Sequence, residues 1–143
     1  MTSPSVHANA LVVGGAGILI RGASKAGKSS LTVALIQAAQ SQGLASALIG
    51  DDRVFLRMDE GRLMAAGHPA IRGQIHVRGF GIVDMPSEDS APVKLVIDLV
   101  REQLNMPTVS SRVKVEGLWV EQLKIMERSQ TPDLLMVILE KIR

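Results

Sequence analysis

The sequence GASKAGKS, from Gly22 to Ser29, constrains this chain more than any other stretch. It matches the pattern G-x-x-x-x-G-K-[ST], in which backbone N–H groups surround nucleotide phosphates, the lysine reaches the β- and γ-phosphates, and the hydroxyl binds magnesium. The apolar run Ile18 to Ile20 predicts the strand that should precede such a loop, and Leu31 to Gln42 predicts the helix that should follow, ending before Gly43. We therefore expect a phosphate loop at a helix N-terminus, where amides and the helix dipole favour an anion. The alternative is an ordinary glycine turn with a chance lysine.

The composition limits the class of protein. With 143 residues, 46% hydrophobic and 21% charged, the chain predicts a single soluble domain over residues 1–143. A net charge of +2 and 2% aromatic residues argue against a nucleic-acid partner, which would need concentrated positive charge or a stacking surface. The apolar stretch Ala10 to Ile20 is too short to cross a bilayer, and the N-terminus lacks the positive charge of a signal peptide. Cysteine is absent, which fits a reducing compartment, so we expect a cytoplasmic protein with no membrane contact.

The rest of the chain predicts strands and helices around this loop. Apolar patterning predicts strands at Val6–Val13, Ile18–Arg21, Ala45–Ile49, Val54–Met58, Leu63–Ala66 and Val93–Val100, and a late strand pair at Leu118–Val120 and Leu123–Ile125. Turn and polar residues predict loops at Ser87–Pro92 and Asn105–Ser111. A helical turn is expected at Ile71–Ile75. The glycines of Val77–Val83 predict a close backbone approach. Thr131, Pro132 and Asp133 predict the start of a last helix. The expected fold class is α/β: a P-loop nucleotide-binding domain with a central mixed sheet, an N-terminal hairpin and a C-terminal helix.

An acidic pair follows the predicted strand Ala45–Ile49. In α/β nucleotide enzymes the carboxyl end of such a strand carries metal and nucleophile chemistry. Asp51 and Asp52 are adjacent, so one carboxylate can hold magnesium while the other faces a substrate hydroxyl. Taken alone, a Gly-Asp-Asp-Arg sequence is more often a solvated turn. The phosphate loop one helix earlier favours the chemical interpretation.

Four segments of the chain, in this order, resemble the HPr kinase/phosphorylases. They are Val6-His7-Ala8, the phosphate loop, Ile49 to Val54 and Val77 to Ile82. The Asp-Asp-Arg-Val and Arg-Gly-x-Gly-Ile elements are the most specific, because few other phosphate-loop proteins carry both. The match covers residues 6 to 100, and the chain looks like the short form of the family, which has the catalytic domain alone.

The resemblance implies a protein-serine kinase that uses ATP and Mg²⁺ on the phosphocarrier HPr, regulates the phosphotransferase system and can run phosphorolysis in reverse. It also implies a homo-oligomer. Asp51 matches the acid–base residue, Asp52 its neighbour beside the metal, Arg78 the signature arginine near the phosphorylated substrate, and His7 a histidine close to the site. For His7 the alternative is a polar residue at a strand start. The expected nucleotide-binding residues are Gly22, Ala23, Ser24, Lys25, Ala26, Gly27, Lys28, Ser29 and Ser30, and the expected metal-side residues are Ser29, Asp52 and His76.

Two positions depart from the family pattern. Lys25 stands where the family usually has glycine, and a positive φ there would cost about 1–2 kcal/mol for a residue with a Cβ. A lysine there could equally add a phosphate contact. His76 stands where the signature has glutamate, and a neutral histidine is a poor magnesium ligand because the ion prefers oxygen. Residue 76 either belongs to the metal shell or only flanks the signature.

These departures leave other functions open. A nucleotide-binding regulatory module with weakened transfer would fit Lys25 and His76. A small-molecule kinase is the third candidate, although such enzymes usually carry an arginine-rich lid, and we find no such cluster in the sequence.

Overall fold

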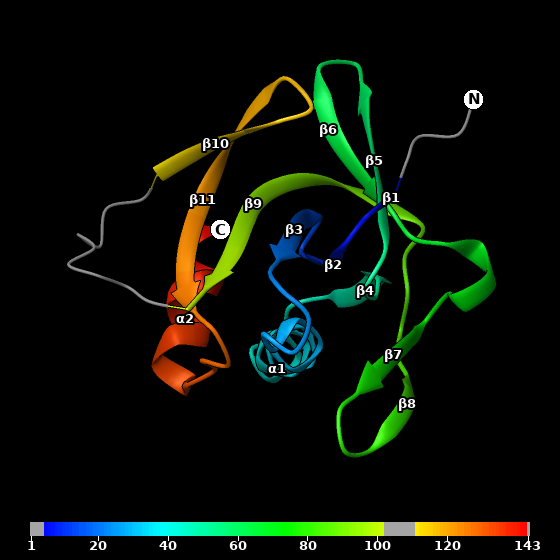
Figure 1. Cartoon of the computed structure of the whole chain (residues 1–143), viewed down its shortest axis with the longest axis vertical. Coiled ribbons are helices and arrows are strands. Elements are labelled where there is room, and N and C mark those ends of the chain that lie inside the picture. Colours follow the sequence, from blue (N-terminus) through cyan, green and yellow to red (C-terminus); the bar gives the residue numbers. More distant parts are fainter. Residues whose placement is uncertain (1–4, 102–110, 143) are drawn as a thin grey trace.

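The computed structural model of the chain describes residues 5–101 and 111–142, and Figure 1 shows a mixed α/β fold built on a curled sheet. The strands are β1 (Ser5–Val6), β2 (Ala8–Val13), β3 (Ala16–Arg21), β4 (Ser46–Gly50), β5 (Val54–Asp59), β6 (Arg62–Ala66), β7 (Gln74–Val77), β8 (Gly81–Asp84), β9 (Ser90–Val100), β10 (Ser111–Val115) and β11 (Leu118–Met126). The helices are α1 (Lys28–Ser41), the 3₁₀ turn η1 (Pro69–Ile71) and α2 (Pro132–Lys141).

The main sheet is organised around the long strand β9. Its order is β1-β5-β6-β9-β3-β2-β4, and β11 joins β9 as a branch that carries β10. One edge of β9 pairs in parallel with β3, while its start pairs antiparallel with β6 and its later part pairs in parallel with β11. The β5–β6 and β10–β11 hairpins pair with β9 toward its two ends, and their tips lie close together at the top of Figure 1. A Cβ at Gly117 would lie 3.8 Å from the Cε atom of Met58. The sheet is mixed, as the sequence predicts.

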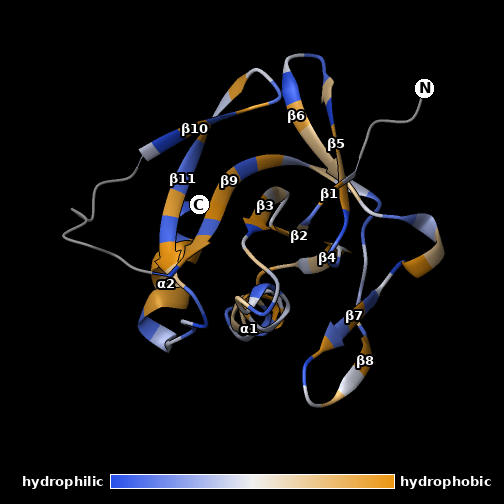
Figure 2. Ribbon diagram, viewed as in Figure 1, coloured by the Kyte–Doolittle hydropathy of each residue, from blue (hydrophilic) through white to orange (hydrophobic). Residues whose placement is uncertain are grey.

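Two apolar cores lie on the two faces of this sheet. On β3 and β9, Ile18, Ile20 and Ile97 belong to the core that α1 and α2 cover, whereas Leu19 and Val96 belong to the other core. Successive strand residues point to opposite faces, so a strand that is apolar at every position is buried on both sides. Figure 2 shows the apolar residues of β3, and those that make up most of β9, at the centre of the molecule. The strand β3, which leads into the loop from Gly22 to Ser29, is therefore packed on both faces.

Most predicted elements are present at slightly different boundaries. The N-terminal hairpin pairs Ala8 to Val13 with Ala16 to Arg21. The helix α1 begins at Lys28, earlier than the predicted Leu31, because the end of the Gly22–Ser29 loop continues into the helix. The closing helix starts as expected, with the Thr131 side chain accepting a hydrogen bond from the Leu134 N–H. The predicted loop Asn105–Ser111 lies almost wholly outside the described residues.

Three predictions of local secondary structure are wrong. Ile71–Ile75 is not one helical turn, because η1 ends at Ile71 and β7 begins at Gln74. Leu118–Val120 and Leu123–Ile125 form one strand, β11, because Leu118 to Gln122 pair with β10 and Glu121 to Met126 pair with β9, so the pairing is continuous. The predicted loop Ser87–Pro92 already contains the first residues of β9.

The glycines of Val77–Val83 mark a turn rather than a close backbone approach. They form the tip of the β7–β8 hairpin, and a Cβ placed at Gly79 or Gly81 would meet no atom within 4 Å. Their φ angles of +82° and +120° explain the glycines instead, since side chains rarely allow that region. This hairpin is a separate two-stranded sheet, and Figure 1 shows it at the lower right, beyond α1.

Among the described residues, no helix is both long enough and apolar enough to cross a membrane.

Candidate active site

The loop from Gly22 to Ser29 connects β3 to α1 and ends at the helix N-terminus. Gly27 is the N-cap residue with φ +97°, and no side chain caps the helix there. The first turn of α1 contains no acidic residue, so the positive end of its dipole is not neutralised locally. An anion at this end can accept hydrogen bonds from helix amides that have no partner within the helix.

The Lys28 side chain lies inside the loop rather than in solvent. It is 7% exposed, and its ammonium donates hydrogen bonds to the backbone oxygens of Gly22 and Ala23, both at 3.1 Å. The ammonium group is therefore held at the centre of the curve that the loop makes. Lys25, at the outer turn of the loop, has φ +69°, which is the strained conformation expected from its departure from glycine.

Asn9 connects the loop helix to the acidic pair. It is fully buried on β2, and its side-chain amide donates to side-chain oxygens of Ser29, Thr32 and Asp51 at 3.3, 3.1 and 2.9 Å. Its side-chain oxygen accepts from the backbone N–H of Asp52 at 2.9 Å. One buried amide thus fixes α1, the strand β2 and the end of β4 against one another.

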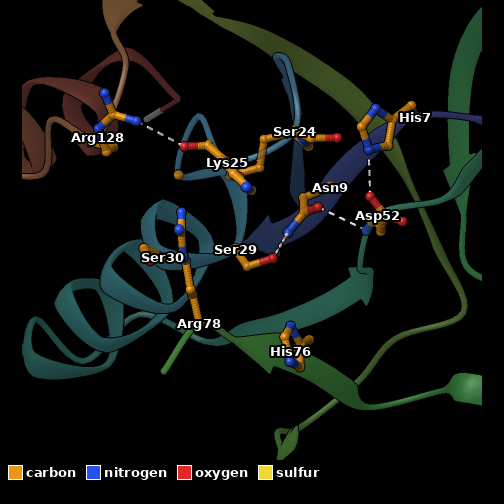
Figure 3. A pocket seen from close by; sticks show the side chains of 12 residues that line it. His7, Asn9, Ser24, Lys25, Ser29, Ser30, Asp52, His76, Arg78 and Arg128 are labelled. Atoms are coloured by element: carbon orange, nitrogen blue, oxygen red, sulfur yellow. Dashed lines mark hydrogen bonds and ion pairs between the residues drawn. The ribbon is translucent and has the colours of Figure 1, made fainter. Parts of the chain in front are cut away.

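The two carboxylates differ in their contacts. Asp51 accepts hydrogen bonds from the Ser29 hydroxyl at 2.6 Å and from the His76 backbone N–H at 2.8 Å. Asp52 has φ +67° and pairs instead with the Nε2 atom of His7 (Figure 3). The expected metal-side pair is Ser29 with Asp52, whereas in the structure Ser29 donates to Asp51. The two carboxylates differ because the backbone at Asp52 has φ +67°, and the Asp52 side chain pairs with His7 instead of Ser29.

A cavity of 390 Å³ opens above the loop, and most of the predicted site residues surround it. Asp51 does not line it, and neither do Gly22, Ala23 and Ala26. The β7–β8 hairpin supplies His76 and Arg78 from the other side (Figure 3). The lining residues are His7, Asn9, Ser24, Lys25, Gly27, Lys28, Ser29, Ser30, Asp52, His76, Arg78 and Arg128.

The donor atoms near Ser29 suit a hard cation. Within the described ranges 5–101 and 111–142, no group of at least three His, Cys, Asp or Glu side chains gathers as a metal site. Ser29 and Asp51 nevertheless bring a hydroxyl and a carboxylate oxygen to within 2.6 Å. Magnesium is usually held by one or two carboxylates together with substrate phosphates and water. The residues present therefore fit Mg²⁺ bound together with a nucleotide, and they do not fit a metal held by protein alone.

A polar network lies behind the loop, at the last residue of β3. The Arg21 guanidinium donates to both carboxylate oxygens of Asp98 at 2.7 and 2.9 Å, and Gln122 also donates to Asp98. Burial acts to raise the pKa of Asp98, but the hydrogen bonds from Arg21 and Gln122 outweigh it and lower that pKa below its usual range. The hydrogen bond to Asp98 raises the pKa of Arg21, against the opposing effect of burial. The network ties β3 to β9 and β11 just before the loop begins.

Sequence reasoning missed two residues of this site. Asn9 could have been noticed as the polar residue inside an otherwise apolar strand, since a buried amide needs partners. Arg128 lies in the turn between β11 and α2, more than a hundred positions from Lys25, and no local pattern marks it. The structure alone brings it to the cavity.

Comparisons with known proteins agree on one family. The family model described as HPr Serine kinase C-terminal domain matches residues 1–126. A HPr kinase/phosphorylase from Mycoplasma mycoides subsp. mycoides is 30% identical over 133 residues, covering 83% of this chain and 41% of that protein. A HPr kinase/phosphorylase from Cupriavidus necator is 32% identical over 133 residues, covering 85% of this chain and 39% of that protein. The chain thus spans about two fifths of the length of these curated relatives.

A solved structure of a related protein has the same fold as this chain. The structure described as the Hpr(Ser) kinase/phosphatase from Coxiella burnetii superposes with a TM-score of 0.78 at 27% sequence identity. The superposition covers 99% of this chain and 89% of that one. The curled sheet and the closing helix are therefore shared with that protein.

Proposed function

The chain belongs to the HPr serine kinase C-terminal domain family, and we propose that it transfers the γ-phosphoryl group of ATP to a serine of an HPr-type phosphocarrier protein. In the reverse direction, inorganic phosphate would take the phosphoryl group from the phosphoserine, releasing the free hydroxyl and pyrophosphate. Such a reaction would regulate a phosphotransferase system. The observation that carries the proposal is the cavity in which Lys28, Ser29 and Asp52 meet at the N-terminus of α1.

The loop residues would bind the nucleotide. Phosphoryl transfer depends mainly on positioning and on neutralising charge, because the protein does little covalent work. Lys28 would exchange its two backbone acceptors for phosphate oxygens, while the amides at the start of α1 hold the same group. Arg78, which lines the cavity from the hairpin, would neutralise charge on the side of the acceptor.

The family resemblance implies that Asp51 is the acid–base residue and that Asp52 lies beside the metal. The contacts of the two carboxylates favour the reverse assignment. Asp51, beside the Ser29 hydroxyl, would hold Mg²⁺ with it, and the bound ion would neutralise phosphate charge. Asp52 lines the cavity and pairs with His7, so its carboxylate can accept the proton of an incoming serine hydroxyl, and His7 can orient it. The side chain of His76 lines the same cavity, and a role for position 76 on the metal side remains a prediction.

The first test measures binding and transfer together. Wild type and Lys28→Ala are titrated with Mg-ATP by calorimetry and then assayed with labelled ATP and a purified HPr-type phosphocarrier. We expect at least about tenfold weaker ATP binding in the variant, equivalent to about 1.4 kcal/mol. Unchanged ATP affinity would refute the phosphate-loop assignment. Binding without transfer to any phosphocarrier would favour a regulatory nucleotide-binding module or a kinase with a small-molecule acceptor.

A second test separates the roles of the carboxylates. Asparagine preserves the shape of aspartate but cannot take a proton, so Asp52→Asn should lower transfer at least about 100-fold at saturating magnesium. Asp51→Asn should instead raise the magnesium concentration needed for half-maximal rate. If Asp51→Asn abolishes transfer at every magnesium concentration while Asp52→Asn does not, the base is Asp51, as the family resemblance implies. His76→Glu, assayed in the same magnesium series, tests whether residue 76 reaches the metal.

A further inference from the structure

Arg128 contacts the phosphate loop from a distant part of the chain. It lies between β11 and α2, and its backbone N–H donates to the backbone oxygen of Ala26 at 2.9 Å. Its guanidinium donates to the backbone oxygen of Lys25 at 3.1 Å. Figure 3 shows this second contact on the far side of the loop from Asp52. Arg128 therefore holds two successive carbonyl groups of the loop.

The contact joins two strained pieces of backbone. Lys25 and Arg128 both have positive φ, +69° and +62°, although neither is glycine. Such residues keep this conformation only where surrounding contacts hold them in it. Packing adds a third constraint, because a Cβ at Gly27 would lie 3.2 Å from the Cα of Arg128. The loop and the turn therefore define each other's shape.

The direction of the hydrogen bonds matters for an anion site. A peptide carbonyl that pointed into the cavity would repel phosphate, whereas a peptide N–H attracts it. Arg128 donates hydrogen bonds to the backbone oxygens of Lys25 and Ala26. Lys28 donates to those of Gly22 and Ala23. Lys28 would leave its acceptors when a nucleotide binds, but nothing in the proposed reaction requires Arg128 to do so.

We propose that Arg128 is a positioning residue for the phosphate loop: it turns the Lys25 and Ala26 carbonyls away from the cavity and so presents the loop amides to a phosphate group. That the loop binds the phosphate of a nucleotide rests on the proposed function. The effect on loop conformation does not, and it can be measured in the protein without any ligand.

The main variant is Arg128→Gly. Glycine accepts φ +62° and keeps the backbone N–H that bonds to Ala26, so the change removes the guanidinium with little backbone strain. Arg128→Asn, which also tolerates this conformation, is the second variant should the first fold poorly. Arg57→Ala is the matched control, because it removes one positive charge from an exposed position on β5 that does not line this cavity.

Two measurements are made on each protein. Hydrogen exchange followed by NMR without ligand reports the amides of residues 24–30, and calorimetry with inorganic pyrophosphate and with Mg-ATP reports binding. For Arg128→Gly we expect faster exchange confined to the loop amides and about tenfold weaker binding of both ligands. The melting temperature and the exchange of the β9 amides should match those of the control.

Three results would overturn the inference. Unchanged loop exchange with weaker binding would make Arg128 a direct phosphate ligand only. Faster exchange throughout the chain, with a lower melting temperature in both Arg128 variants, would make its role one of general stability. Unchanged exchange and binding would leave it no role in the site. If wild type binds neither ligand, the proposed function fails, and loop exchange in the ligand-free proteins still decides for or against Arg128.

Discussion

The cavity lies between two regions that are held in different ways. On the side of the Gly22–Ser29 loop, Asn9 and Thr32 are fully buried and hydrogen-bonded to their neighbours. On the opposite side, the β7–β8 hairpin forms its own two-stranded sheet, and Phe80 and Ile82 are 79% and 66% exposed. Ile75 is the fully buried side chain by which the hairpin joins the core.

We infer from this difference that the two regions have different roles. A phosphate group needs donors placed to within a fraction of an ångström, and buried, mutually bonded side chains provide that precision. A region with few buried contacts opens locally at a lower free energy than the core, so it can adjust to a bulky acceptor. The bond from the His76 backbone N–H to Asp51 links the two regions at the point where the chemistry is proposed.

The largest effect on stability is expected from a change at Asn9, whose side chain makes four hydrogen bonds beside the cavity. Asn9→Ala removes one hydrogen bond each from Ser29, Thr32 and Asp51, and it takes the side-chain acceptor from the Asp52 N–H. We expect a loss of about 3 kcal/mol in the free energy of unfolding. Urea denaturation measures it. A loss below about 1 kcal/mol would mean that water replaces the amide and that this side is less rigid than its contacts indicate.

A smaller effect is expected from loosening the hairpin. Ile75→Ala should cost about 2 kcal/mol, near the low end for a buried isoleucine, because the hairpin can detach while the main sheet stays folded. Ile82→Ala on the same hairpin is the control, and its exposed side chain should contribute less than about 0.5 kcal/mol. Hydrogen exchange should rise in β7 and β8 alone. An equal rise in β3 and β9 would show that the two regions unfold as one unit.

The Arg21–Asp98 network allows a test by pH. The pKa of Asp98 is lower in the folded protein than in the unfolded chain, so its ionisation stabilises the fold above the unfolded value of about 3.9. That stabilisation is lost as the pH falls through the folded pKa. Asp98→Asn should therefore be less stable than wild type by about 1–2 kcal/mol at neutral pH, and the difference should shrink in acid. Denaturation curves at several pH values check this, and a difference independent of pH would contradict it.

The smallest effect concerns the strained turn of the loop. Lys25→Gly accepts φ +69° without a Cβ clash, so it should raise the stability by about 0.5–1 kcal/mol, less the entropy that glycine adds to the unfolded chain. The carbonyl that Arg128 holds is still present in this variant. Thermal unfolding gives the sign. Destabilisation would indicate that the lysine side chain makes a stabilising contact that its exposure does not suggest.

The sequence alone was sufficient for most of the helices and strands. Ile18 to Ser29 predicts a strand, a glycine loop and a helix, because apolar runs, glycines and a lysine at fixed spacing act locally. The start of the last helix at Thr131 is predicted for the same reason. The predictions fail where local signals are ambiguous, as at Ile71–Ile75, which tertiary contacts divide between a 3₁₀ turn and a strand.

Only the tertiary structure decided which side chains meet. Adjacent aspartates are equivalent in the sequence, and the backbone turn at Asp52 separates them, giving Asp51 to Ser29 and Asp52 to His7. Arg128 reaches Lys25 because the parallel pairing of β9 with both β3 and β11 brings the ends of β3 and β11 together. Local sequence sets backbone preferences within a few residues, whereas contacts between distant segments depend on how the whole sheet packs.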